Sequence, residues 1–190
     1  MRAFSGTVVL LLALGLVPAF SGTAAAARPI EDYPSYVPSE RCHPKPFAGT
    51  RLLGAWVSRK NGGGYVGMER ACNRKDGPTS EHQTGRAFDW SVDADRLADR
   101  RRARDFLRTV FAADRFGNRD ALARRMGIVY LIWDDQIYPA WNEYRPEPYL
   151  SSSCKKLRKC SKTLRHRDHV HVSLSRAGAL GRTSWYERRI

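Results

Sequence analysis

The chain has 190 residues, with 33 Lys and Arg against 19 Asp and Glu, so that its formal net charge is +14. Beyond the amino-terminal stretch, no segment is apolar enough to cross a bilayer, which excludes a protein with several membrane spans. The positive charge favours anionic partners or simply keeps the protein in solution, and these two readings are equally open.

The first 27 residues have the pattern of a secretory signal peptide. Met1 and Arg2 give a positive start, residues 8–20 are apolar or small, and residues 24–27 are alanines. An uncleaved anchor is the weaker reading, because the apolar run is too short for a good membrane span. We expect cleavage after Ala27 and export of a monomer that keeps no stable membrane anchor. The mature chain is long enough for one domain with a real core.

The four cysteines are Cys42, Cys72, Cys154 and Cys160. In an exported chain an even number of cysteines predicts disulfides, and four of them allow three pairings. We favour Cys42–Cys72 with Cys154–Cys160, because the second pair closes a short local loop. A cysteine-based zinc site is the alternative, but the chain has no C-x-x-C spacing.

The mature chain predicts a mixture of helices and strands. Five prolines over residues 28–46 predict an extended arm. Hydrophobic spacing predicts, in chain order, a helix over 47–59, strands over 65–71 and 86–92, helices over 95–113 and 120–126, and strands over 128–133, 136–138 and 169–174.

Two segments between these elements are expected to be loops. Residues 73–79 are polar, and residues 139–165 form a long segment without periodicity, of a kind that is usually functional. Helices and strands joined by local hairpins indicate the α+β class. We therefore divide the chain into a signal peptide (1–27), an arm with a short helix (28–60) and the main domain (61–190).

Three of the five histidines lie within the stretch RHRDHVHVSLS, residues 165–175. Side chains two apart on a strand share a face, so His169 and His171 point to one side while Val170 and Val172 point to the core. A row of imidazoles on the open face of a sheet is typical of a site wall. By itself an H-x-H pair is more often an exposed polar face.

A second stretch, SEHQTGRAFDWSVDA at residues 80–94, makes a site the better interpretation. Gly85 permits a tight turn that brings His82 over Asp89 on the following strand. Two imidazole nitrogens and one carboxylate are a ligand set typical of catalytic zinc, which leaves the fourth coordination position for water. His82, Asp89 and His171 supply that set. The neighbouring His169 is then placed to take a proton from the attacking water.

The pattern S-x-H-x-x-G-x-A-x-D, followed downstream by H-x-H, resembles the zinc peptidase superfamily of lysostaphin, D-alanyl-D-alanine carboxypeptidases and hedgehog-type domains. The resemblance is strongest to the branch of D-alanyl-D-alanine carboxypeptidases and penicillin-insensitive murein endopeptidases. The ending HRDHVHVS is similar to the endopeptidase type, and the stretches RRMGIVYLIWDDQIY and GRTSWY resemble a family of secreted bacterial domains in that superfamily. The likeness covers about residues 62–186.

The resemblance implies a small antiparallel sheet that carries a zinc (Zn2+) site and is flanked by helices. It implies that His82, Asp89 and His171 are the ligands, that His169 is the general base, and that His166 lies near the water or the substrate. Carboxypeptidases of the branch carry E-x-x-H near the third ligand. This chain has no glutamate there, which favours the endopeptidase.

Several other residues are weaker candidates for the site. We expect Asp168 to pair with Arg165 or Arg167, because it precedes His169 and so points to the opposite face. Asp93 is expected to cap the next helix or to support a ligand histidine.

The remaining candidates are the arginines that could bind a substrate carboxylate, Arg74 and Arg86, and the aromatic residues that could line a cleft, Trp90, Trp133, Trp141 and Tyr144. Core packing is the better reading for Trp90 and Trp133, and plain surface for His43.

A run of basic side chains with no acid among them precedes the last strand. Its members are Lys155, Lys156, Arg158, Lys159, Lys162, Arg165 and Arg167. Such runs are usually solvated surface. At the mouth of a cleft, however, a positive rim would attract an anionic substrate.

These features together predict a secreted zinc metallopeptidase, extracellular or associated with the cell wall, that hydrolyses stem peptides or cross-links of peptidoglycan. Anionic wall polymers are a further expected partner. One alternative is an inactive, metal-bearing module that binds the wall. A second is a basic protein that binds nucleic acid, for which the sequence has no groove-reading or base-stacking motif.

Overall fold

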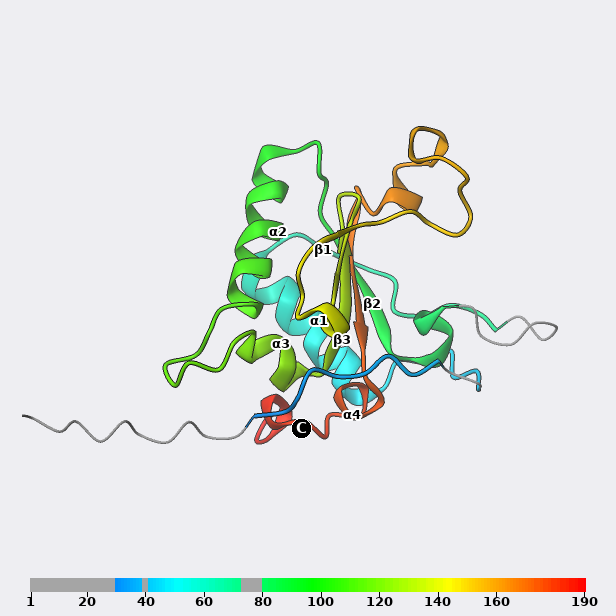
Figure 1. Ribbon diagram of the computed structural model, residues 1–190. Helices are drawn as coiled ribbons and strands as arrows, with labels where there is room; N and C mark the ends of the chain where they lie inside the picture. The colour runs from blue at the N-terminus through cyan, green and yellow to red at the C-terminus, as the bar shows by residue number, and fades with distance from the viewer. Residues whose placement is uncertain (1–29, 39–40, 73–79) are drawn as a thin grey trace, which may run out of the picture.

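The computed structural model describes residues 30–38, 41–72 and 80–190, and its centre is one six-stranded antiparallel sheet (Figure 1). The predicted signal peptide and the polar loop 73–79 lie outside the described residues. The strand order is β1-β2-β6-β3-β4-β5, so the last strand, β6, lies in the middle. The strands are β1 (Gly64–Val66), β2 (Ala87–Ser91), β3 (Ile128–Trp133), β4 (Gln136–Pro139), β5 (Glu147–Pro148) and β6 (His169–Leu174).

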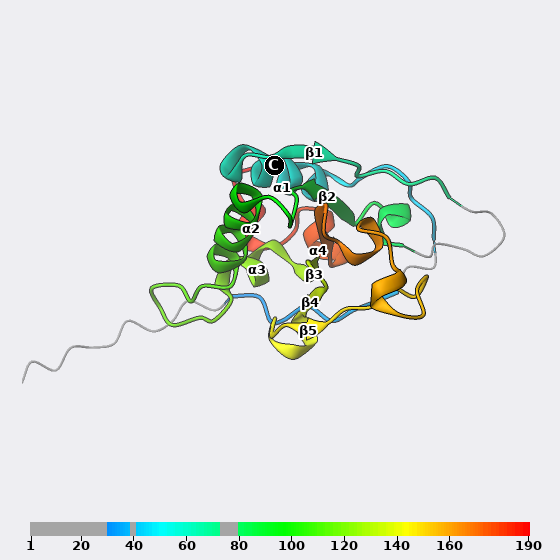
Figure 2. The same ribbon diagram turned by 90° about the horizontal axis from the view of Figure 1, so that it is seen from above.

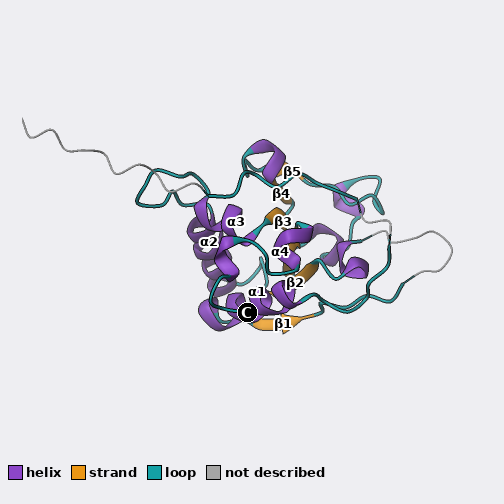
Figure 3. Ribbon diagram, turned by 90° about the horizontal axis from the view of Figure 1, so that it is seen from below, coloured by secondary structure: helices purple, strands orange, loops and turns teal. Residues whose placement is uncertain are grey.

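In the described part of the chain four α-helices accompany the sheet, and the predicted α+β class is confirmed. They are α1 (Ala48–Asn61), α2 (Leu97–Val110), α3 (Ala121–Met126) and α4 (Arg176–Ala179). Seen from above and from below, α2 and α3 lie together to one side of the strands (Figures 2 and 3). None of the described helices is long and apolar enough to cross a membrane.

The core lies between these helices and one face of the sheet. Phe88 and Trp90 of β2 are buried against α1 and α2, where the rings of Trp90 and Phe106 meet edge to face at 5.6 Å. Val170 and Val172 of β6 are fully buried in the same cluster. Each of these residues alternates with a polar one, so the opposite face of β2 and β6 is left for polar side chains.

Most predicted elements are found, with shifted ends. The helix over 120–126 is α3, and it ends at Gly127 in the left-handed conformation (φ 69°) that favours glycine. The turn of the predicted hairpin is Asp134-Asp135, where both φ angles are positive and match the twist of the flanking strands. The strand expected over 65–71 is wrong beyond Val66, because only β1 pairs with β2.

The segment 139–165 has more local structure than its sequence indicated. It contains three short 3₁₀ turns and β5, which pairs with the edge strand β4. The turns are η2 (Ala140–Asn142), η3 (Leu157–Lys159) and η4 (Thr163–Arg165). None of them is long enough to show a hydrophobic period, which explains why the pattern missed them.

Both predicted disulfides are present, Cys42–Cys72 and Cys154–Cys160. Such pairs are typical of proteins that fold outside the reducing cytoplasm.

The described part of the proline-rich arm forms no helix or strand, in agreement with the predicted extended arm, and it is bonded to the domain. The hydroxyl of Tyr33 donates to Asp120 at 2.6 Å, and that of Ser184 donates to Glu31 at 2.9 Å. These contacts hold the described part of the arm along the protein surface, where Figure 1 shows it in blue.

Candidate metal centre

Strand pairing places two of the predicted ligands side by side. In the antiparallel register of β2 and β6, Asp89 lies directly opposite His171, and Ser91 lies opposite His169. Directly paired residues of neighbouring strands point to the same face. The prediction that His169 and His171 share the face away from the core is therefore confirmed.

A tight turn brings the third predicted ligand over the strands. His82 lies in the 3₁₀ turn η1 (Glu81–Thr84), which ends at Gly85 in the left-handed conformation (φ 69°). A β-carbon at Gly85 would lie 2.5 Å from the carbonyl oxygen of Lys45, so that no side chain fits there. Glycine at this position thus sets the path that returns the chain from His82 to β2.

The three side chains form a compact set of donor atoms that could hold a metal ion. Nε2 of His82 lies 3.1 Å from Oδ1 of Asp89 and 3.2 Å from Nδ1 of His171, and the last two atoms are 2.9 Å apart. A tetrahedral zinc ion with ligands at about 2.0–2.1 Å separates its ligand atoms by roughly 3.3 Å. The triangle therefore matches the base of such a tetrahedron.

The protonation states of the set also suit a metal. Burial opposes the charge of Asp89, but hydrogen bonds from His171 and His82 outweigh it and hold the pKa of the carboxyl well below its usual range. Burial lowers the pKa of His171, although Asp89 works against this. A carboxylate and a neutral imidazole are the forms that bind a divalent cation.

His171 is held in place on its other side as well. Its Nε2 lies 2.9 Å from the hydroxyl of Ser173, and the ring of Tyr130 stacks on the imidazole at 5.7 Å with an interplanar angle of 22°. Tyr130 in turn donates from its hydroxyl to the carboxylate of Glu81 at 2.6 Å. Supporting contacts of this kind fix the orientation of a metal-binding histidine.

His169 lies beside the triangle and is oriented by a carboxylate. Its Nε2 is 3.6 Å from Oδ1 of Asp89, and its Nδ1 is 2.6 Å from Oδ1 of Asp168. The prediction that Asp168 pairs with Arg165 or Arg167 is wrong. Asp168 precedes the first residue of β6, so the alternation of a strand does not apply to it, and its side chain turns toward the imidazole.

His166 also reaches the cluster. Its ring centroid lies 4.7 Å from that of His169 and 5.6 Å from that of His171, and its backbone is left-handed (φ 49°). Its Nδ1 is buried without a hydrogen-bond partner among the described residues. Burial, followed by the neighbouring His171 and His169, lowers the pKa of His166 to about 2.

The arginine and carboxylate candidates lie elsewhere. Asp93 accepts from Lys162 at 2.6 Å and from the amide of Asp95 at 2.8 Å, ahead of α2. Arg86 is buried, and it donates to the carbonyl of Val37 at 3.0 Å. These contacts are structural, and Arg74 lies outside the described residues.

The aromatic candidates divide between the core and the surface. Trp90 and Trp133 are buried in the core, as expected. Tyr144 is buried too and donates to the carbonyl of Ile128 at 2.5 Å, so its assignment to a cleft wall is wrong. Trp141 is 55% exposed, and its ring lies 6.2 Å from that of Tyr130 next to His171. His43 is exposed, as expected.

Sequence reasoning missed Glu81, Tyr130 and Ser173. A signal existed for two of them, since Glu81 precedes a predicted ligand and Ser173 continues the outward side of the H-x-H strand. Tyr130 had none, because β3 is continuously apolar and a bulge between Ile128 and Tyr130 shifts its alternation.

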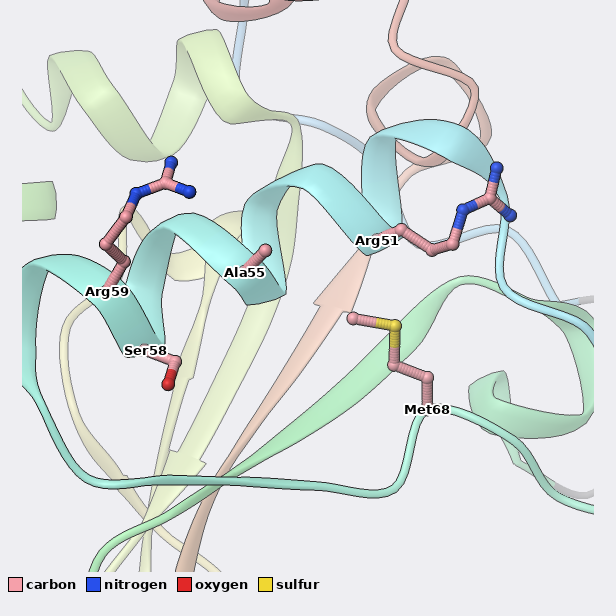
Figure 4. Close-up of a pocket in the computed structure, with 5 residues that line it drawn as sticks. All are labelled: Arg51, Ala55, Ser58, Arg59 and Met68. Atoms are coloured by element: carbon pink, nitrogen blue, oxygen red, sulfur yellow. The ribbon is translucent and has the colours of Figure 1, made fainter.

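One cavity lies apart from this cluster. It is an open groove of about 460 Å³ between α1 and the segment that follows β1 (Figure 4). Its lining residues are Arg51, Ala55, Ser58, Arg59 and Met68. None of them contributes to the histidine cluster, so the groove is separate from the candidate metal centre.

Comparison with known proteins gives one family. The model of the family described as VldE, C-terminal domain matches residues 53–154, just over half of the chain. No curated protein matches, and no solved structure does either. The matched stretch contains His82 and Asp89 and ends before His166, His169 and His171. By this match the chain belongs to the VldE C-terminal domain family.

Proposed function

We propose that the protein is a secreted, zinc-dependent peptidase that hydrolyses stem peptides or cross-links of peptidoglycan. The observation that carries the proposal is the triangle of His82, Asp89 and His171 with His169 beside it. We further propose that its sheet belongs to the hedgehog-type and D-Ala-D-Ala-peptidase-like folds. The antiparallel pairing of a His-x-His strand with the Asp strand supports this assignment.

His82, Asp89 and His171 would hold the zinc ion. When bound, zinc would polarise the scissile carbonyl and lower the pKa of the attacking water. Ser173 and Tyr130 contact His171 from two sides and would fix the orientation of this ligand. A site with three protein ligands leaves a position for chemistry, whereas a fourth protein ligand would close it.

His169 would accept the proton of the water. Because Asp168 accepts a hydrogen bond from Nδ1, the lone pair of the neutral ring is at Nε2, which points toward Asp89 and the triangle. This arrangement combines a base with a carboxylate that fixes its tautomer. The same carboxylate would stabilise the imidazolium that forms after the transfer.

His166 would act as a neutral polar group next to the reacting atoms. Its low pKa keeps the ring uncharged at neutral pH, and its free Nδ1 has one hydrogen bond to offer. The role that fits this position is a contact with the substrate or with the oxygen that becomes negative in the transition state.

The cell wall is proposed as the place of action. The two disulfides support folding outside the cytoplasm, and the net charge of +14 would attract the protein to anionic wall polymers. An endopeptidase specificity is proposed over a carboxypeptidase one, on the resemblance of the HRDHVHVS ending.

The test combines metal analysis with digestion of purified peptidoglycan on the same preparations. Wild-type protein should carry one zinc per chain and release peptide fragments that mass spectrometry identifies. His171→Ala should lose both properties. His169→Ala should keep nearly stoichiometric zinc and lose hydrolysis by about 10²- to 10⁴-fold.

The control is His43→Ala, which removes an exposed imidazole that is not part of the cluster. Its Nδ1 contacts the carbonyl of Lys45, and its backbone amide, which the substitution keeps, donates to the carbonyl of Gln83. This variant should leave zinc content and hydrolysis unchanged. Wild-type protein that binds zinc but releases no fragment would favour a metal-bearing wall-binding module over a peptidase. Loss of zinc in His169→Ala would make His169 a ligand and the centre a closed one.

A further inference from the structure

The basic run that leads into β6 divides into two parts with different surroundings. The three carboxy-terminal members are paired with carboxylates. Lys162 contacts Asp93 at 2.6 Å and Asp95 at 2.7 Å. Arg165 and Arg167 pair with aspartates of the β3–β4 turn and of the loop before α2. These charges are compensated and serve to hold the loop stems together.

The other part of the run has no such partners. Its members lie inside the loop closed by the Cys154–Cys160 disulfide, and all four are exposed. They are Lys155, Lys156, Arg158 and Lys159. None of them forms an ion pair with a carboxylate in the described ranges. We call these four residues the basic loop.

One stem of the loop contacts His166, and both stems bind Asp135 of the β3–β4 turn. The ring of Tyr149 meets that of His166 edge to face at 5.0 Å, and the amide of Tyr149 donates to the carbonyl of Asp135. On the return side, Arg165 donates to the carboxylate of Asp135 at 2.9 and 2.6 Å. The loop thus starts and ends beside the histidines, and Figure 1 shows it in orange, projecting away from the helices.

We propose that the basic loop binds a phosphodiester polymer of the polyol-phosphate type, such as poly(glycerol phosphate), beside the metal centre. Four uncompensated positive charges within one disulfide-closed loop give a strong local potential toward a flexible polyanion. The disulfide limits the conformations of the free loop, which reduces the entropy that binding must remove. The proposal concerns binding alone and does not depend on the peptidase activity.

The composition of the loop distinguishes this partner from two others. Single-stranded nucleic acid is held by aromatic side chains on which its bases stack, and residues 150–165 contain none. The ring of Tyr149, which precedes them, packs against His166. A membrane surface requires a broad apolar face, whereas the exposed large hydrophobic residues of this segment are Leu150 and Leu157 alone. A polyol phosphate needs only charge and hydrogen-bond donors.

The experiment measures the affinity of the oxidised protein for poly(glycerol phosphate) between 50 and 200 mM salt. Four phosphate contacts with a flexible strand predict a slope of log K against log salt near −2.8, and hence a loss of about 50-fold over this range. The test variant replaces the basic loop with Lys155→Gln, Lys156→Gln, Arg158→Gln and Lys159→Gln.

The control variant removes the same charge from exposed basic residues elsewhere that form no ion pair with a described carboxylate. It carries Arg101→Gln, Arg104→Gln, Arg176→Gln and Arg182→Gln. The loop variant should lose most of the affinity and most of the salt slope, and the control should lose little of either. Equal losses in both variants would overturn the proposal, because only the total charge would then matter.

Two further probes separate the partners. Single-stranded DNA of equal phosphate number and vesicles of phosphatidylglycerol with phosphatidylcholine are titrated in the same buffer. The proposal expects both to bind more weakly than poly(glycerol phosphate). Binding to either as tightly as to poly(glycerol phosphate), or more tightly, would overturn it. Since zinc content and hydrolysis of a soluble peptide are expected to be unchanged in the loop variant, failure here is distinguishable from failure of the peptidase proposal.

Discussion

The contact between Asp168 and His169 leads to a quantitative prediction for Asp168→Asn. The carboxylate lies 2.6 Å from Nδ1 of the imidazole, and the substitution keeps the shape while it removes the charge. A hydrogen bond to a charged group contributes about 1.5–3 kcal/mol and a neutral one about 0.5–1.5 kcal/mol. The side chain of Asp168 is 36% exposed, so solvent screens part of this difference. We take about 1 kcal/mol, which is roughly a fivefold loss of kcat/KM.

The assay compares kcat/KM on soluble cross-linked muropeptides with zinc content measured on the same samples. Zinc should remain stoichiometric, because Asp168 is not one of the three predicted ligands. Thr163→Val is the matched control. It removes the other side chain that donates to Asp168, at 2.5 Å, without touching His169, and should change kcat/KM by less than about twofold.

Three outcomes would refute the reasoning. An unchanged kcat/KM in Asp168→Asn would show that the carboxylate does not assist the base. Loss of zinc would show that Asp168 contributes to zinc binding. A loss as large as that of His169→Ala would mean that the base does not act without the carboxylate, which is far beyond the screened difference of about 1 kcal/mol.

Three other substitutions test the supports of the site and of the fold. Gly85→Ala should cost at least about 1–2 kcal/mol of stability and weaken zinc binding, because the new β-carbon meets the carbonyl of Lys45; urea titration and zinc competition measure both. Tyr130→Phe should cost about 1–3 kcal/mol, since it leaves the largely buried carboxylate of Glu81 without its 2.6 Å donor; an unchanged urea midpoint would contradict this. Hydrogen bonds, first that from the side chain of Asn118, lower the pKa of Asp114 from 3.8 to about 2, so its stabilising effect is present above pH 4 and lost as the pH falls toward 2. Asp114→Asn should therefore be less stable at pH 7 and lose less stability than wild type between pH 4 and pH 2, and equal losses in urea titrations would count against this assignment.

The sequence predicted the geometry of the candidate metal centre best where the position of a side chain depends on local rules. Alternation on a strand put His169 and His171 on one face, and the glycine turn brought His82 over Asp89. Both rules act over a few residues and need no knowledge of the rest of the fold. The disulfides followed from export and from the short spacing of Cys154 and Cys160.

Contacts set by tertiary packing could not be predicted in this way. Tyr130 reaches His171 because β3 pairs with β6, and a bulge decides which of its residues face the site. Asp168 was assigned to the wrong side because the alternation of β6 was extended one residue beyond its start. Tyr144 is an aromatic residue of the kind that often lines a cleft, but the path of the 139–165 segment buries it. Each of these depends on the exact course of the backbone between elements.

The central claim is that His82, Asp89 and His171 hold a catalytic metal with a free fourth position. Anomalous diffraction at the zinc edge, on crystals of the zinc-loaded protein, tests it most directly. We predict one peak within about 2.2 Å of Nε2 of His82, Oδ1 of Asp89 and Nδ1 of His171, with solvent as the fourth ligand. A peak in which Nε2 of His169 takes the fourth position, or one away from this triangle, would contradict the account.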